Sequence, residues 1–219
     1  SGMLCVDGVL YMLVRNVGHS QVAWSDDHAR TWHWCNWKFE AGFGAPTFLN
    51  FGRDYIGARD VYVYVYSPDS DTAYEPGDRM VLALVPKQKI RSQAAYEFFQ
   101  GLNAEGHPRW TQDIRDRAAV FVHPGSCYRS GTSYNAGLDR YLWCQILPLS
   151  TDERGPRFQG GFGIYEAPEP WGPWRTAFYT NAWDVGPGET ASFPTKWISP
   201  DGRTCYLAFS GNDCFSVRK

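Results

Sequence analysis

The chain has 219 residues, with 43% hydrophobic residues, 20% charged residues and a formal net charge of −2. No cluster of lysine and arginine marks a nucleic-acid-binding face, and no stretch of about 18 apolar residues could cross a membrane. These features favour one globular domain of ordinary core size that binds neither nucleic acid nor membranes.

Four aromatic-rich runs follow turns that contain glycine and aspartate. They cover residues 9–14, 61–66, 140–145 and 204–209. A further apolar run follows each of the first three, at residues 21–25, 80–85 and 162–166. Short alternating runs separated by glycine, proline, asparagine and aspartate are typical of an all-β fold.

The spacing of these runs predicts repeated four-stranded antiparallel units, the blades of a β-propeller. Tyr11, Tyr62, Tyr141 and Tyr206 occupy equivalent places, separated by 51, 79 and 65 residues. A propeller blade takes about 40–50 residues, so the longer intervals predict insertions. One insertion is a short helix expected over residues 87–100, and a second short helix is conceivable over residues 111–118. A β-sandwich with similar hairpins is the alternative fold.

We expect a single propeller domain over residues 1–219, with blades at about 1–50, 51–121, 122–183 and 184–219. This division gives three full units and a partial fourth, whereas propellers usually close with four to eight blades. The sequence therefore leaves two explanations: the chain is a fragment, or self-association with another chain completes the ring.

The cysteines and histidines do not form a pattern that binds metal. Six cysteines are present, none in a C-x-x-C pair, and several lie in apolar runs where thiols pack as small hydrophobic groups. Five histidines are scattered without metal-ligand spacing, and phosphate-binding, dinucleotide-binding and serine-elbow motifs are absent. We predict neither a cofactor nor a metal.

One turn resembles the Asp-box of sialidase-type propellers, a structural hairpin motif. Ser25, Asp27, Thr31 and Trp32 match it, while Ala29 stands where glycine is usual. This resemblance implies the propeller fold and says little about chemistry.

A broader resemblance covers most of the chain. Residues 164–174 are similar to a turn of five-bladed furanosidase propellers. Together with residues 9–16, 64–71, 96–99 and 127–130, the chain resembles bacterial proteins that carry the domain of unknown function numbered 4185, a glycosidase-like propeller family. Some members of that group are endo-acting arabinan hydrolases. The resemblance implies a five-bladed type of propeller, incomplete here, that acts on carbohydrate.

Glycoside hydrolysis needs two carboxyl groups across the scissile bond, one to donate a proton and one to activate water or attack. We predict Asp60, Asp69 and Glu166 as catalytic candidates, because each lies at the end of a predicted strand. Glu189 precedes another predicted inner run and is a further candidate. The alternative for Asp69 and its neighbour Asp71 is a turn-forming role, since aspartate bonds nearby backbone.

Polar and aromatic residues on predicted inner strands suit sugar recognition. Arg129, Tyr134 and Asn135 lie where an inner strand should be small and apolar, and arginine offers a forked donor to hydroxyl or carboxylate groups. Arg59 and Trp143 complete the predicted substrate-binding set. The alternative is that these groups link neighbouring blades by hydrogen bonds.

The leading hypothesis is therefore a glycoside hydrolase that acts on a polysaccharide or oligosaccharide. The alternatives are a non-catalytic carbohydrate-binding propeller and a protein-interaction scaffold. Residues 1–8 lack the charged and apolar regions of a signal peptide. The location is not set by the sequence, and a secreted or periplasmic protein is the hypothesis.

Overall fold

The computed structural model describes residues 2–148 and 158–219. Its first sheet is antiparallel and has the order β1-β2-β3-β4, with β1 Met3–Val6, β2 Val9–Arg15, β3 Ser20–Ser25 and β4 His33–Trp34. Asp7 and Gly8 join β1 to β2 with φ values of 49° and 78°, in the left-handed region that suits glycine and aspartate. Alternate side chains of β2, including Tyr11 and Leu13, are buried, as expected for a strand with one face on the core.

The second and third units form one ten-stranded sheet in which β10 pairs with β7 beside the main path. The second unit comprises β5 Thr47–Asn50, β6 Tyr62–Pro68, β7 Gly77–Pro86, β8 Glu97–Leu102, β9 Pro108–Thr111 and β10 Ala119–Cys127. The third comprises β11 Ser130–Asn135, β12 Arg140–Pro148, β13 Gly160–Ala167 and β14 Arg175–Thr180. They join because β11 pairs in parallel with β5.

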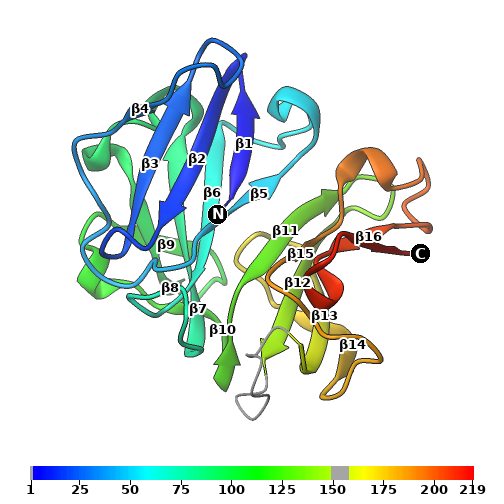
Figure 1. The fold of residues 1–219 in the computed structure, drawn as a ribbon. Coiled ribbons are helices and arrows are strands. Elements are labelled where there is room, and N and C mark those ends of the chain that lie inside the picture. The colour runs from blue at the N-terminus through cyan, green and yellow to red at the C-terminus, as the bar shows by residue number, and fades with distance from the viewer. Residues whose placement is uncertain (1, 149–157) are drawn as a thin grey trace.

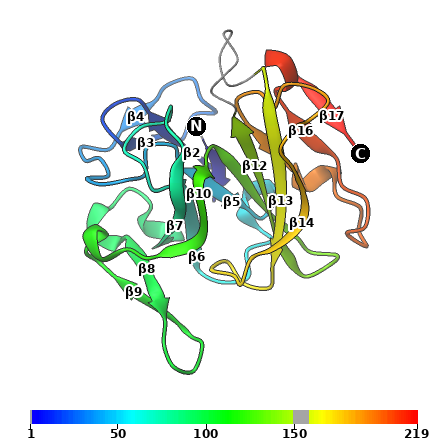
Figure 2. The same ribbon diagram turned by 90° about the horizontal axis from the view of Figure 1, so that it is seen from below.

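The last sheet is small and has three antiparallel strands. These are β15 Ala191–Ser192, β16 Leu207–Phe209 and β17 Ser216–Arg218. Figure 2 shows the sheets around the middle of the molecule, with β2–β4 and β16–β17 on opposite sides.

The innermost strands β5 and β11 pair in parallel and run side by side (Figure 1), the start of β1 lies beside the start of β5, and β15 follows β11 in the same direction. The backbones of β11 and β15 lie close together at Gly131. A Cβ atom there would lie 2.2 Å from the backbone oxygen of Ala191, so only glycine fits this position. Further along, the Ser133 hydroxyl donates to the Phe193 carbonyl at 2.7 Å. We call the end where these four strands begin the start face, and the opposite end the end face. Antiparallel units around parallel inner strands define an all-β, propeller-like fold, which confirms the predicted fold class.

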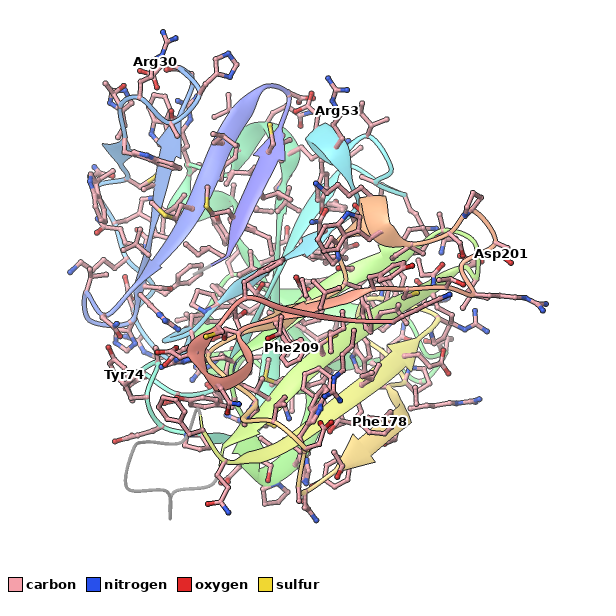
Figure 3. The ribbon with its side chains drawn as sticks, turned by 45° about the vertical axis from the view of Figure 1, so that its right-hand side comes forward. Arg30, Arg53, Tyr74, Phe178, Asp201 and Phe209 are labelled. Carbon is pink, nitrogen blue, oxygen red and sulfur yellow. The ribbon has the colours of Figure 1, made fainter. Side chains whose placement is uncertain are left out.

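Figure 3 locates the two faces. Arg53 and Asp201 lie in turns at the end face, and Tyr74 lies toward the start face. Two hydrophobic clusters connect the sheets. One spans the first and second units and reaches Trp143, and the other joins the third unit to the last sheet around Phe162 and Phe209.

The helix predicted over residues 87–100 is wrong. The segment forms two short 3-10 turns, Lys87–Lys89 and Gln93–Ala95, and then strand β8. The apolar spacing that favoured a helix instead arises because Tyr96 is buried and donates to the Ile90 carbonyl at 2.8 Å, while Phe98 pairs with Ala83 of β7. Sheet pairing therefore overrides the local helical pattern.

The second helix considered, over residues 111–118, is also reduced to a single 3-10 turn, Ile114–Asp116. The Asp113 carboxylate caps it by accepting from the Arg115 backbone N–H at 2.9 Å. The described part of the chain contains no helix long and apolar enough to span a bilayer. All six cysteines lie within the described residues and are free thiols, with Cys35, Cys127 and Cys144 buried.

Two turns share a serine–aspartate–threonine arrangement. In the first, Ser25 donates to Asp27 at 2.8 Å, and the Asp27 carboxylate accepts from the backbone and hydroxyl of Thr31 at 2.9 and 2.6 Å. These hydrogen bonds lower the pKa of Asp27 to about 2. In the second, Ser199 donates to Asp201 at 2.6 Å and accepts from the backbone of residue 204 at 2.9 Å. The carboxylates in both turns hold hairpin geometry.

Candidate functional site: the axial cleft

A cleft of about 100 Å³ lies at the start face, where the four inner strands begin. Residues at or just before all four strand starts line it, namely Gly2, Thr47, Ser130 and Thr190. Arg15, Arg129 and Glu189 supply its charge. We call it the axial cleft. Because parallel inner strands bring their first residues to one place, four distant segments of the sequence meet there.

Arg129 is the most buried charged side chain of the cleft, with 6% of its side chain exposed. Its Nε donates to the carbonyl of Ala73 at 2.9 Å, and its Nη1 forms an ion pair with Oε2 of Glu189. A guanidinium held by several groups is fixed in orientation, and it fixes the Glu189 carboxylate in turn.

Glu189 is held between two arginines. Besides Arg129, Nη2 of Arg15 lies 3.6 Å from the same Oε2 atom. The Ser210 hydroxyl accepts from the Glu189 backbone N–H at 2.6 Å, which fixes the segment that leads into β15. About a third of the Glu189 side chain is exposed, so its carboxylate is accessible from the cleft.

Ser130 adds a hydroxyl without a partner. The residue is 7% exposed, and its Oγ is buried with no hydrogen bond among the described residues. A buried polar atom without a partner costs free energy, about 1–3 kcal/mol, unless a ligand or water satisfies it. Its position on the lining of the cleft makes a ligand hydroxyl a suitable partner.

Two tyrosines flank Arg129. The guanidinium carbon lies 5.0 Å from the ring centroid of Tyr128, which is buried, and 5.4 Å from that of Tyr74, which is 64% exposed. The Tyr74 hydroxyl accepts from the Asn16 amide at 2.9 Å. An exposed ring thus lies beside a guanidinium that lines the axial cleft.

Asp69, a predicted catalytic residue, follows β6 at the start face but is occupied by arginines. Its Oδ2 accepts from Arg79 Nε at 2.6 Å, and its Oδ1 accepts from Arg117 Nε and Nη2 at 2.8 and 2.6 Å. Only 7% of the Asp69 side chain is exposed. The neighbouring Asp71 accepts from the backbone N–H of Gly42 at 2.7 Å. The catalytic role of Asp69 stays a prediction, and its contacts with the two arginines favour a structural role.

Asp60 and Arg59 lie at the end face, far along the inner strands from Arg129. The Asp60 carboxylate accepts from the Tyr62 backbone at 2.8 Å and from the Tyr64 hydroxyl at 2.6 Å. Burial, together with the Asp60 carboxylate, raises the pKa of Tyr64 well above its ordinary value. Asp60 therefore acts as an acceptor for the second unit's own strand.

Arg59 joins a small surface cluster with the predicted binding residue Tyr134. Its guanidinium donates to Asp139 at 2.7 Å and lies 5.5 Å from the Tyr134 ring centroid. The Tyr134 hydroxyl donates to the same Asp139 oxygen at 2.7 Å. Burial, with the Asp139 carboxylate, raises the pKa of Tyr134. The structure thus brings Arg59, Asp60 and Tyr134 to one face, but Arg129 to the other.

The remaining predicted residues make structural contacts. Asn135 is buried and donates to the Gly202 carbonyl at 2.8 Å, which joins β11 to the last sheet. Glu166, on β13 near the end face, forms an ion pair with Arg140 at 3.0 Å. Trp143 is 1% exposed and packs against Phe121 at 4.6 Å between ring centroids. Among the described residues, no group of three or more histidine, cysteine or acidic side chains could hold a metal ion.

Sequence reasoning found two of the charged residues of the axial cleft and missed Arg15. Arg129 was visible as a charged residue on a predicted inner strand, and Glu189 because it precedes one. Arg15 lies at the end of the second strand of the first unit. It contacts Glu189, which is 174 residues further along the chain (from 15 to 189), and no local pattern predicts such a contact. Tyr74 lies in a loop and carried no signal beyond its ring.

Comparison with known proteins gives structural neighbours only. No family model matches the chain, and no curated protein matches its sequence. A Bacteroides ovatus protein has a TM-score of 0.49 and 14% identity over 94% of this chain and 52% of its own. A GH43_1 enzyme from Xanthomonas citri has a TM-score of 0.47 and 12% identity over 98% of this chain and 65% of its own. A mutant α-L-arabinanase of Cellvibrio cellulosa has a TM-score of 0.41 and 11% identity over 99% of this chain and 88% of its own.

The chain therefore spans about half the length of the Bacteroides protein and about two thirds of the Xanthomonas enzyme. At identities of 11–14% these likenesses concern the path of the chain, and they carry no statement about activity.

Proposed function

We propose that this chain is a carbohydrate-active protein that binds a glycan at the axial cleft. The observation that carries the proposal is the convergence of Arg129, Glu189 and the unpartnered Ser130 hydroxyl where the four inner strands begin. The resemblance of the sequence to glycosidase-like propellers supports the same class of ligand.

The chemistry of the cleft suits a ligand rich in hydroxyl groups. Arg129 holds the Glu189 carboxylate in place, Glu189 offers acceptors, and the Ser130 hydroxyl can donate and accept. Tyr74 provides an exposed ring beside Arg129, on which the apolar face of a sugar can stack. A few convergent polar groups beside an aromatic ring are typical of small-ligand sites.

Within this proposal the reaction is hydrolysis of a glycosidic bond, with Glu189 as one of the two carboxyl groups required. Glu189 is preferred to Asp60 and Glu166 because those two lie toward the end face and bind partners of their own. A polysaccharide is the expected substrate. Secretion to the cell exterior or periplasm stays a prediction, as does the membership in the family of domain 4185.

A non-catalytic glycan-binding protein is the second candidate. It is favoured by the lining of the cleft, in which Glu189 is the one carboxylate among the described residues. Self-association that completes the ring also stays a prediction. Two exposed apolar side chains support self-association: Val217 lies on the edge strand β17, and Phe215 directly precedes it. An apolar strand edge can accept a further strand.

The test measures both binding and the release of reducing ends from arabinan, xylan, galactan and a carboxylated polysaccharide such as polygalacturonate. Glu189→Gln removes the charge at the cleft, and Glu166→Gln is its matched control, a glutamate with a single arginine partner at 3.0 Å. We expect Glu189→Gln to abolish release and Glu166→Gln to leave it within about twofold, with both variants folded. Loss with Glu166→Gln alone would overturn the placement of the site.

Binding without release in the wild-type chain would favour the second candidate. In that case Arg129→Ala should weaken binding by at least about tenfold, because the guanidinium that holds the Glu189 carboxylate in place is lost. Absence of both binding and release would overturn the proposal.

A further inference from the structure

An aromatic-lined cavity lies away from the axial cleft, on the outer flank of the first two sheets. Its volume is about 340 Å³, within the range of roughly 300–1,000 Å³ of small-molecule sites. Its walls come from the loop that follows β4, from the 3-10 turn Gln93–Ala95, and from the segment that follows β9. We call it the flank groove.

The aromatic wall of the flank groove is rigid. Trp37 donates its indole N–H to the Arg91 carbonyl at 2.9 Å and contacts Phe39 and Tyr96 edge-on, at 5.4 and 5.2 Å between ring centroids. Since the only polar atom of the indole is used inside the protein, Trp37 has only apolar ring surface to offer a ligand. A ring already fixed in place loses little entropy when a ligand stacks on it.

The polar rim combines donors and acceptors. The Gln93 amide donates to the Glu40 carboxylate at 3.2 Å, which ties two walls together. The Gln112 amide and the Arg115 guanidinium are exposed and make no side-chain hydrogen bond within the described part of the chain. Two groups next to a fixed ring are therefore available to a ligand.

The charges of the flank groove cancel. Lys38 and Arg115 are balanced by Glu40 and Asp113, whereas the axial cleft has two arginines and one glutamate. A balanced lining gives no net attraction for an anion or a cation, so a neutral ligand is favoured. Amide and guanidinium donors, carboxylate acceptors and a flat ring together match the hydroxyl groups and the apolar face of a neutral sugar.

We propose that the flank groove is a second glycan-binding site, which takes a neutral oligosaccharide segment stacked on Trp37 and hydrogen-bonded by Gln112 and Arg115. The site is separate from the axial cleft, and its binding does not depend on the reaction proposed there. It would hold a neutral polymer on the protein at a place away from the axial cleft.

The test uses the full chain and neutral arabino-, xylo- and galacto-oligosaccharides of four to six units, titrated in calorimetry. Nuclear magnetic resonance of the ¹⁵N-labelled chain follows the Trp37 indole signal, identified from its absence in Trp37→Phe. We compare the double variant Gln112→Ala/Arg115→Ala with Gln88→Ala/Arg109→Ala, a control of the same residue types on exposed positions outside the groove. Glu189→Gln reports on the axial cleft.

We expect one of these oligosaccharides to shift the Trp37 signal. The groove double variant should weaken the binding followed at the Trp37 signal by about tenfold, since two hydrogen bonds are lost, while the Gln88→Ala/Arg109→Ala control should stay within about twofold. Binding that Glu189→Gln removes and the groove variant leaves intact would overturn the flank groove while supporting the axial cleft. Failure of every neutral oligosaccharide to shift the Trp37 signal would overturn the flank groove, whatever the axial cleft binds.

Discussion

Asp69 provides the sharpest test of structure against sequence, because it was predicted as catalytic and is found between two arginines. The change Asp69→Asn leaves Arg117, whose side chain is 13% exposed, without its counter-charge. Removal of one partner of a buried ion pair costs about 3–5 kcal/mol. The Arg79 side chain is 45% exposed, so water can solvate its charge once Asp69 is neutral. The loss of this second ion pair should therefore cost under about 1 kcal/mol in the free energy of unfolding.

We expect a total loss of about 3 kcal/mol in the free energy of unfolding, since Arg117 keeps its hydrogen bond to the Ile114 carbonyl at 2.7 Å. For a chain of this size the melting temperature should fall by about 6–12 °C. Urea unfolding followed by tryptophan fluorescence measures the free energy, and a constant slope against urea shows that the denatured state is unchanged.

The matched control is Asp71→Asn, because the Asp71 side chain is 74% exposed and should cost under about 1 kcal/mol. The double variant Asp69→Asn/Arg117→Gln should recover part of the loss, since neither charge is then left alone. A change of less than about 1 kcal/mol for Asp69→Asn, together with lost glycan hydrolysis, would refute the structural role and restore the catalytic one.

Two further predictions concern the turns and the inner strands. The pKa of Asp27 falls from 3.8 to about 2 on folding, so its stabilisation is complete above about pH 4 and is lost as the pH falls toward 2. Melting curves of wild type and Asp27→Asn should differ at pH 5 and converge near pH 2, and a constant difference would contradict this. Gly131→Ala should cost about 1–3 kcal/mol or more in urea unfolding, because its Cβ would lie 2.2 Å from the Ala191 oxygen. Unchanged stability would show that β11 and β15 can separate.

The alternating runs and their turns predicted the strands well. Aromatic and β-branched residues at every second position bury one face of a strand in a half-buried sheet, and a helix would not place them on one face. The helix over residues 87–100 failed for a different reason. The spacing of apolar residues in this segment fits both a helix face and a turn that buries Tyr96. The pairing of Phe98 with Ala83 of β7, a long-range contact, decides in favour of the turn and strand.

The candidate site was only partly predictable. A carboxylate beside a strand end looks the same in sequence whether it meets a ligand or an arginine, as Asp69 and Glu166 illustrate. What separates Glu189 from them is the meeting of four strand starts, which depends on the parallel direction of the inner strands. Such long-range convergence leaves no local pattern.

The parallel pairing of β5 with β11 has a consequence for how the molecule unfolds. Thr132 and Ser133 pair with Leu49 and Asn50, so two repeats that would otherwise touch only through side chains share one hydrogen-bonded sheet. Local opening proceeds in cooperative units bounded by weak contacts. The strands of the second and third repeats should therefore exchange their amide protons as one block. A chain boundary chosen between the second and third repeats would cut through this block, whereas a boundary before β5 or after β14 would leave it whole.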